Sequence, residues 1–109
     1  MATILKVLGQ SYPSPTTLTT LYTVPSATST VISTIIICNQ TATDSSFRIA
    51  IRPAGASIVN QHYIYYDTPI LSNDSITLTA GISLATTDVV SVYTTIAGLS
   101  FNLYGQENS

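Results

Sequence analysis

Short runs in which apolar and polar residues alternate recur along the chain, and this pattern constrains the fold more than any other feature. In the run FRIAIR at 47–52 every second side chain is apolar, as in a β-strand with one buried face. Similar runs rich in Val, Ile and Thr follow at roughly 8–14-residue spacing, with turn-forming residues between them. The predicted strands are 3–8, 18–24, 30–38, 47–52, 62–66, 76–80, 89–94 and 99–104, with 82–84 as a further short strand or a connector.

The pattern predicts an all-β protein, because no segment repeats its apolar residues at the helical period. About eight short strands favour one antiparallel β-sandwich domain over 1–109, with a short extended N-terminal arm and a polar tail at 105–109. A jelly roll fits this number of strands, and an immunoglobulin-like sandwich fits nearly as well, since strand order cannot be read from the sequence. Breaks are expected at 9–11, at 67–69 and at Gly81, where turn-forming residues interrupt the runs.

Charge is unusually scarce in this chain. Charged residues make up 7% of the 109 residues, against about 25% in typical proteins. The polar surface must therefore come largely from the 18 Thr and 14 Ser. Three cations cannot form the basic stripe that nucleic-acid binding requires. A chain this neutral and this apolar is better suited to an assembly than to life as a free monomer.

No constellation of residues typical of catalysis or cofactor binding is found in the sequence. One His and one Cys, His62 and Cys38, cannot build a tetrahedral zinc site. The five acids are scattered, mostly in predicted turns, where Asp is expected for local hydrogen bonds. Cys38 lies in an apolar run, and we expect a buried thiol there. We expect no enzyme activity, no cofactor, no metal, no signal peptide and no membrane span.

The segment from the FRIAIR strand to the next predicted strand is the most distinctive stretch. Arg48 and Arg52 share one face of their strand, either as solvated charges protecting a sheet edge or as anchors to a neighbouring subunit. In the run at 62–66 the alternation places Tyr63 and Tyr65 on one face and Tyr66 on the other. These rings could pack into the core or form an exposed platform for a protein or a sugar ring. The candidate interface residues are Arg48, Arg52, His62, Tyr63, Tyr65 and Tyr66.

Several phrases of the sequence carry a family resemblance. They are FRIAIRPAGA at 47–56, NQHYI at 60–64, ATTDVVSVY at 85–93, LSFNLYG at 99–105 and the opening segment at 8–25. With these phrases the chain resembles small virion structural proteins of tailed bacteriophages, above all phages of cyanobacteria and other aquatic bacteria.

The resemblance implies a component of the virus particle without catalytic residues. It favours a capsid cement (decoration) protein, a homotrimer on the capsid surface that contacts the major capsid protein and is made in the host cytoplasm. A tail, neck or fibre-associated subunit is the first alternative, and a glycan-binding module for host recognition is the second. Either particle role would depend on contact area between subunits rather than on chemistry.

Overall fold

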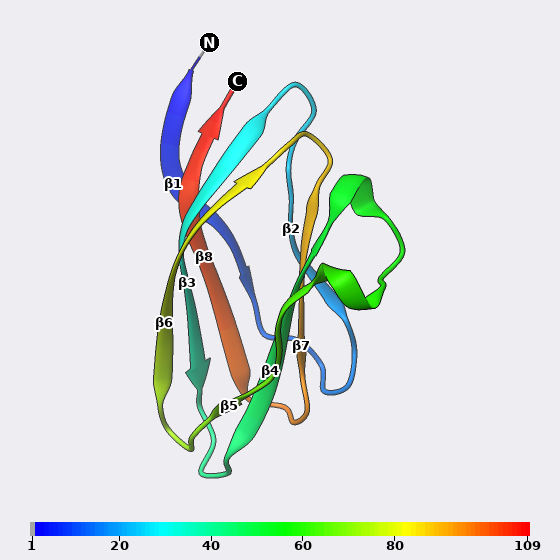
Figure 1. Cartoon of the computed structure of the whole chain (residues 1–109). Coiled ribbons are helices and arrows are strands. Elements are labelled where there is room, and N and C mark those ends of the chain that lie inside the picture. Colours follow the sequence, from blue (N-terminus) through cyan, green and yellow to red (C-terminus); the bar gives the residue numbers. More distant parts are fainter. Residues whose placement is uncertain (1) are drawn as a thin grey trace.

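The computed structural model describes residues 2–109, apart from the side chain of Ala80. Within these residues the chain forms two packed β-sheets and two short 3₁₀ turns, with no α-helix (Figure 1). The molecule measures 45 × 27 × 19 Å along its principal axes. The elements are β1 Thr3–Ser11, β2 Thr19–Thr23, β3 Ser29–Asn39, β4 Ser45–Arg52, η1 Pro53–Gly55, η2 Asn60–His62, β5 Tyr63–Ile70, β6 Ser75–Leu84, β7 Val89–Thr94 and β8 Leu99–Asn108.

The strand order identifies the sandwich as a jelly roll. One sheet has the order β1-β8-β3-β6 and the other has the order β2-β7-β4-β5, and all neighbours are antiparallel. Strand 1 thus pairs with 8, 2 with 7, 3 with 6 and 4 with 5, which gives the two Greek keys of a jelly roll. The predicted all-β sandwich is confirmed, and the immunoglobulin-like alternative, with its different strand order, is wrong.

Three predicted breaks are wrong, because the strands continue through them. β1 runs on to Ser11 and β8 runs on to Asn108, so the expected polar tail is a paired strand. Gly9 and Gly105 lie at close backbone approaches, where a side chain would collide with the carbonyl oxygens of Leu21 and Val31. The two ends are joined, since the Ala2 and Ser109 backbones exchange hydrogen bonds of 2.7 and 2.9 Å.

Strands β5 and β6 pass through the other expected breaks as irregular strands. Asp67 lies within β5 with a φ of 51°, and Gly81 lies within β6 with a φ of 62°. Both residue types tolerate this left-handed backbone better than most. Local distortion of this kind re-aims side chains without ending the strand. The side chain of Ala80, at the end of the predicted strand 76–80, lies outside the described side chains.

The core lies between the two sheets. Alternate residues of β3 and of the first half of β8 are buried there, as the period-2 pattern predicts, whereas β7 is buried at all positions but Tyr93. Phe101 of one sheet meets Phe47 of the other edge to face, with ring centroids 6.2 Å apart. Burial of a large side chain contributes about 1.5–3 kcal/mol, so this double layer supplies the main stabilisation of the sandwich.

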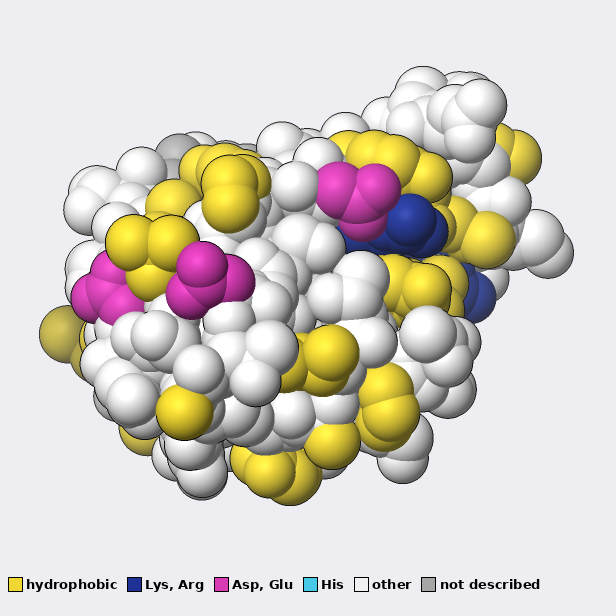
Figure 2. Space-filling model, turned by 90° about the horizontal axis from the view of Figure 1, so that it is seen from below, with side chains coloured by type: hydrophobic (Ala, Val, Ile, Leu, Met, Phe, Trp, Pro, Cys, Tyr) yellow, Lys and Arg dark blue, Asp and Glu magenta, His cyan; other side chains and the backbone are white. Residues whose placement is uncertain are grey.

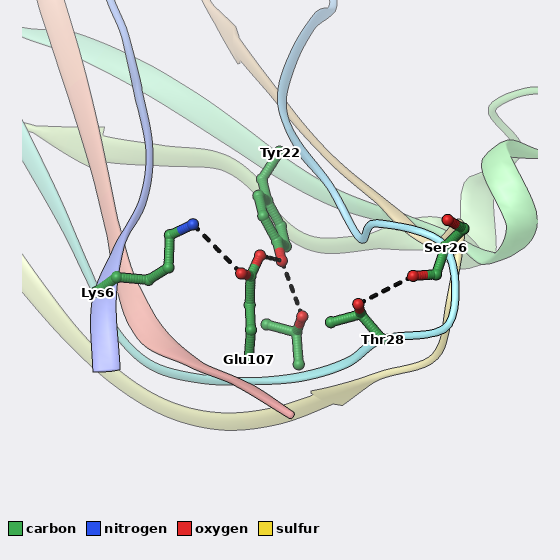
Figure 3. A network of polar contacts seen from close by, with 6 residues as sticks. Lys6, Tyr22, Ser26, Thr28 and Glu107 are labelled. Atoms are coloured by element: carbon green, nitrogen blue, oxygen red, sulfur yellow. Dashed lines mark hydrogen bonds and ion pairs between the residues drawn. The ribbon is translucent and has the colours of Figure 1, made fainter. Parts of the chain in front are cut away.

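A polar network closes the sandwich near the chain ends (Figure 3). The Tyr22 hydroxyl donates to Glu107 and contacts the Thr30 hydroxyl at 2.8 Å, and Lys6 Nζ lies 3.2 Å from Glu107 Oε1. Burial, reinforced by the bond to Glu107, raises the pKa of Tyr22 to about 12. The hydrogen bond from Tyr22 is the largest cause that lowers the pKa of Glu107. The network therefore links β1 and β8 of one sheet to β2 of the other.

Candidate functional site

Bulges in β5 decide which tyrosines face outward. Two steps along β4, from Phe47 to Ile49, match three steps along β5, and one step to Ala50 matches two more. Each extra residue shifts the alternation, since a slip of one position moves side chains to the other face. Tyr65 therefore packs on the core beside Phe47, with centroids 6.2 Å apart.

The predicted grouping of the tyrosines is wrong as a result of these bulges. Tyr63 and Tyr66, predicted on opposite faces, lie together on the outer face of β5, with centroids 5.0 Å apart in an edge-to-face contact. Tyr65, predicted to share a face with Tyr63, points to the core instead.

Arg48 is the centre of an aromatic cluster on this outer face. Its guanidinium carbon lies 4.1 Å from the ring centroid of Tyr66, 4.4 Å from that of Tyr93 and 6.0 Å from that of Tyr63. Such stacking of a cation on aromatic faces is attractive. The guanidinium also binds Asp67, with Nε donating to Oδ1 at 2.7 Å and Nη2 to Oδ2 at 3.4 Å. We call Arg48, Tyr63, Tyr66, Asp67 and Tyr93 the tyrosine–arginine cluster.

The cluster is held by charge pairing and borders an open hollow. The hydrogen bond to Asp67 is the main cause that raises the pKa of Arg48, so the guanidinium stays charged at any ordinary pH. Asn60, Tyr63 and Tyr66 line a surface hollow of about 380 Å³ beside it. In Figure 2 an acidic side chain lies against basic ones, with hydrophobic-class side chains, a class that includes Tyr, on either side. The arrangement is a fixed aromatic surface with hydrogen-bonding groups at its edge.

The other two predicted interface residues are used inside the chain. Arg52 donates to the Ala56 carbonyl at 2.7 Å, to the Gly55 carbonyl at 3.0 Å and to the Ser91 hydroxyl at 3.3 Å. His62 Nδ1 accepts the Val59 backbone N–H at 3.2 Å. Both residues thus brace the connection between β4 and β5. The expectation that the arginines protect a sheet edge is wrong, because β4 lies between β7 and β5.

The outer face of the other sheet has a different character. The large apolar side chain of Leu5 is 78% exposed there, and that of Val7 is 47% exposed. We call this surface the uncharged face. Its outward positions come from β1 (Leu5, Val7), β3 (Val31, Ile36, Cys38), β8 (Tyr104, Gln106) and β6 (Thr77, Thr79).

A hollow of about 450 Å³ runs along the uncharged face between Leu5, Val31 and Tyr104. Of the charged residues only Lys6 borders it, and its ammonium group turns to Glu107. Cys38 is half-buried on this face, so the predicted buried thiol is wrong. Val31, Ile36 and Cys38 make the 30–38 run apolar on both sides, yet the described chain places no layer over its outer side.

Loop acids form the predicted local hydrogen bonds at Asp74 and between Asp88 and Ala85, while the bonds of Asp44 to Ser72 and of Asp88 to Ala54 join distant loops. Asp44 accepts the Ser72 N–H, Asp74 accepts the Ser75 N–H, and Asp88 accepts the N–H groups of Ala54 and Ala85. Asp67 differs, because it belongs to a strand and pairs with Arg48. Each of the eight charged side chains therefore has a partner within the chain, and few charges interrupt the surface seen in Figure 2.

Sequence reasoning found part of the tyrosine–arginine cluster and missed the uncharged face. Arg48, Tyr63 and Tyr66 were expected at an interface, but their partners Asp67 and Tyr93 were not. Tyr93 lies opposite Arg48 in the register of β4 and β7, which no local pattern reveals. The two-sided apolar character of 30–38 was the available signal for the uncharged face.

No metal or membrane feature is found in the part of the chain that the structure describes. No three His, Cys, Asp or Glu side chains among these residues lie together as metal ligands would. No helix among them has the length and apolar character needed to cross a bilayer.

Comparison with solved structures gives a distant likeness. No protein-family model and no curated protein sequence matches the chain. Among solved structures, a chain in the structure of infectious bursal disease virus Gx strain is similar over 97% of this chain, with 15% identity and a TM-score of 0.43. The present chain spans 30% of that chain's length. The function proposed below therefore rests on the uncharged face of the sandwich and not on this likeness.

Proposed function

We propose that this chain is a virion structural protein that works by contact, as a capsid cement or decoration subunit of a tailed bacteriophage. In this proposal it bridges neighbouring major capsid subunits on the capsid surface as a homotrimer, without catalysing a reaction. The observation that carries the proposal is the uncharged face, a sheet surface with exposed Leu5 and Val7 and no covering layer in the described chain.

Burial of this face against a neighbour is energetically favourable. Contact with a protein partner removes apolar surface from water, at about 25 cal/mol per Å². A charged side chain buried at such a contact would need a partner to offset its desolvation. The uncharged face avoids that cost, because Lys6 at its border is already paired with Glu107. Hydroxyl and amide groups such as Thr77 and Gln106 can bond across an interface without a charge.

The jelly roll agrees with this proposal at the level of the fold. Jelly rolls occur in viral capsid proteins and in lectins, although a fold alone does not determine function. Every charged side chain has a partner within the molecule, which also supports a function through uncharged contact. A protein of this kind does not depend on charge to find its partners, and repeated neighbours at high local concentration would provide the necessary encounters.

Copy number per particle tests the proposal and its first alternative. Quantitative mass spectrometry of purified virions should find on the order of hundreds of copies for a cement protein of a symmetric shell. A number between about six and a few dozen would favour the tail, neck or fibre alternative. Absence from the particle would contradict both.

A matched pair of variants tests the contact surface. The double variant Leu5→Asp and Val7→Asp should lose particle binding while the free protein stays folded, because both residues are exposed. Leu71→Asp is the control, since Leu71 is 59% exposed in the loop that follows β5. Equal particle occupancy of the two variants in co-sedimentation would contradict a role for the uncharged face.

A further inference from the structure

We propose that the tyrosine–arginine cluster, together with Asn60, is a binding site for a pyranose ring of a neutral glycan. The site lies on the outer face of β2-β7-β4-β5, on the other sheet from the uncharged face. It is therefore independent of the contact function proposed above.

The backbone of β5 is irregular where the cluster forms. Two extra residues in β5 and the left-handed backbone of Asp67 bring Tyr66 and Asp67 against Arg48. Unusual backbone of this kind concentrates at ligand sites, where it holds side chains in a fixed arrangement. The guanidinium between Tyr66 and Tyr93 restrains both rings. A ligand would find the rings already ordered, which reduces the entropic cost of binding.

The exposed groups match the two kinds of surface that a sugar presents. Tyr66 stays 57% exposed even though it stacks on Arg48, and an aromatic ring can pack against the C–H face of a pyranose. The hollow bordered by Asn60, Tyr63 and Tyr66 offers an amide and two phenolic hydroxyls beside that ring. Sugar hydroxyls both donate and accept hydrogen bonds, and these groups do so as well.

Arg48 and Asp67 add planar hydrogen-bonding groups at the same place. A guanidinium has five N–H donors, and Asp67 takes two of them in the bonds from Nε and Nη2. The remaining donors and the carboxylate oxygens can bond neighbouring hydroxyls of one ring. Ligand sites in proteins typically combine an apolar surface with a few fixed polar groups in this way.

The charge balance selects a neutral sugar over an acidic one. Asp67 already compensates Arg48, and the donors of Arg52 are taken by the Gly55 and Ala56 carbonyls and by Ser91. A uronate, sialate or phosphate group would have to displace Asp67, in a chain with a formal charge of −2. A neutral hydroxyl-rich ring can bind without breaking the ion pair.

A glycan array probed with the full chain tests this proposal. The array carries neutral oligosaccharides of glucose, galactose, mannose and N-acetylglucosamine beside sialylated and uronic-acid glycans. We expect binding to at least one neutral glycan, followed by titration of that glycan by NMR. Tyr66→Ala should weaken its affinity by about tenfold, because the stacking surface is lost.

Three comparisons make the result decisive. Tyr12→Ala is the matched control, since Tyr12 is 60% exposed outside the cluster. The affinity of this variant for the glycan should equal that of the natural chain. Tyr66→Phe should keep most of the affinity, and the unfolding transition of Tyr66→Ala shows whether the fold is kept. The Leu5→Asp and Val7→Asp variant should bind the glycan normally, which separates this site from the contact function. Binding to acidic glycans alone, no glycan binding, or equal loss in Tyr66→Ala and Tyr12→Ala would overturn the proposal.

Discussion

The two outer faces of this sandwich are both built from antiparallel strands, but they expose different kinds of side chain. On β2-β7-β4-β5, Arg48 is fixed by an ion pair with Asp67 and by stacking on Tyr66 and Tyr93. On β1-β8-β3-β6, Leu5 and Val7 are exposed, and charge is absent from the outward positions of the described strands. The first face presents aromatic and charged groups in a fixed arrangement. The second presents an uncharged surface that costs little free energy to desolvate. The few charges of this chain are therefore placed unevenly: one outer face carries the Arg48–Asp67 ion pair, and the described outward strand positions of the other carry no charge.

The largest predicted effect is on the hydrophobic core, which supports both outer faces. Phe101→Ala deletes the ring that meets Phe47 across the core and should lower the free energy of unfolding by about 3–5 kcal/mol. Particle binding and glycan binding should then fail together. Urea denaturation measures the loss, and a change below about 1 kcal/mol would mean that the two sheets do not depend on this contact.

The next prediction separates the faces by stability. Arg48→Ala removes two ring stacks and the ion pair to Asp67, and should cost about 1–2 kcal/mol of unfolding free energy. Leu5→Asp should cost less than about 0.5 kcal/mol, because Leu5 is largely solvent-exposed. Thermal unfolding of the two variants side by side checks the order. Equal costs would contradict the view that only one face is held in a fixed arrangement.

A smaller effect concerns the network that links the sheets near the chain ends. Tyr22→Phe removes the hydroxyl bonds to Glu107 and Thr30 and should cost about 1 kcal/mol at neutral pH. The folded pKa of Tyr22, about 12, lies above its ordinary value of 10.0. Its protonated form therefore contributes stability that is complete below pH 10 and lost as pH rises toward 12. Denaturation at pH 8, 10 and 11 should show a steeper alkaline loss in the natural chain than in Tyr22→Phe, and parallel losses would contradict this.

The smallest predicted effect concerns salt, which should leave the affinity for the particle unchanged. Particle binding through an uncharged face should keep its affinity when NaCl rises from about 0.05 to about 0.5 M, because salt screens charges and does not weaken apolar contact. Co-sedimentation at both salt concentrations tests this. A fall of tenfold or more would mean that ion pairs carry the contact, and would contradict the role given to Leu5 and Val7.

The sequence predicted the class of fold well because period-2 alternation and β-branched residues act locally. Strand β7 and the end of β4 lie where expected. The ends of β1, β5, β6 and β8 were missed, because Gly and Asp serve bulges and close approaches as well as turns. Gly105, beside the Val31 carbonyl, is one such case. Only the register of strand pairing shows whether a Gly or Asp ends a strand or lies at a bulge or close approach within it.

The candidate site was predicted in part for a related reason. Arg48 and Tyr66 could be singled out from composition, but the bulges that turn Tyr65 inward depend on the pairing of β5 with β4. Tyr93 reaches Arg48 through the pairing of β4 with β7. Such long-range pairings are not encoded in any local pattern of residues. The uncharged face was missed because it is defined by four strands that are far apart in sequence.

Electron microscopy of the intact particle, at a resolution that orients this subunit, would show which outer face of the sandwich lies against a neighbour. We expect the outer face of β1-β8-β3-β6, with Leu5 and Val7, to lie against a neighbouring subunit, while Tyr66 faces the solvent. A subunit whose Leu5 and Val7 face the solvent while other surfaces make all the contacts would contradict it.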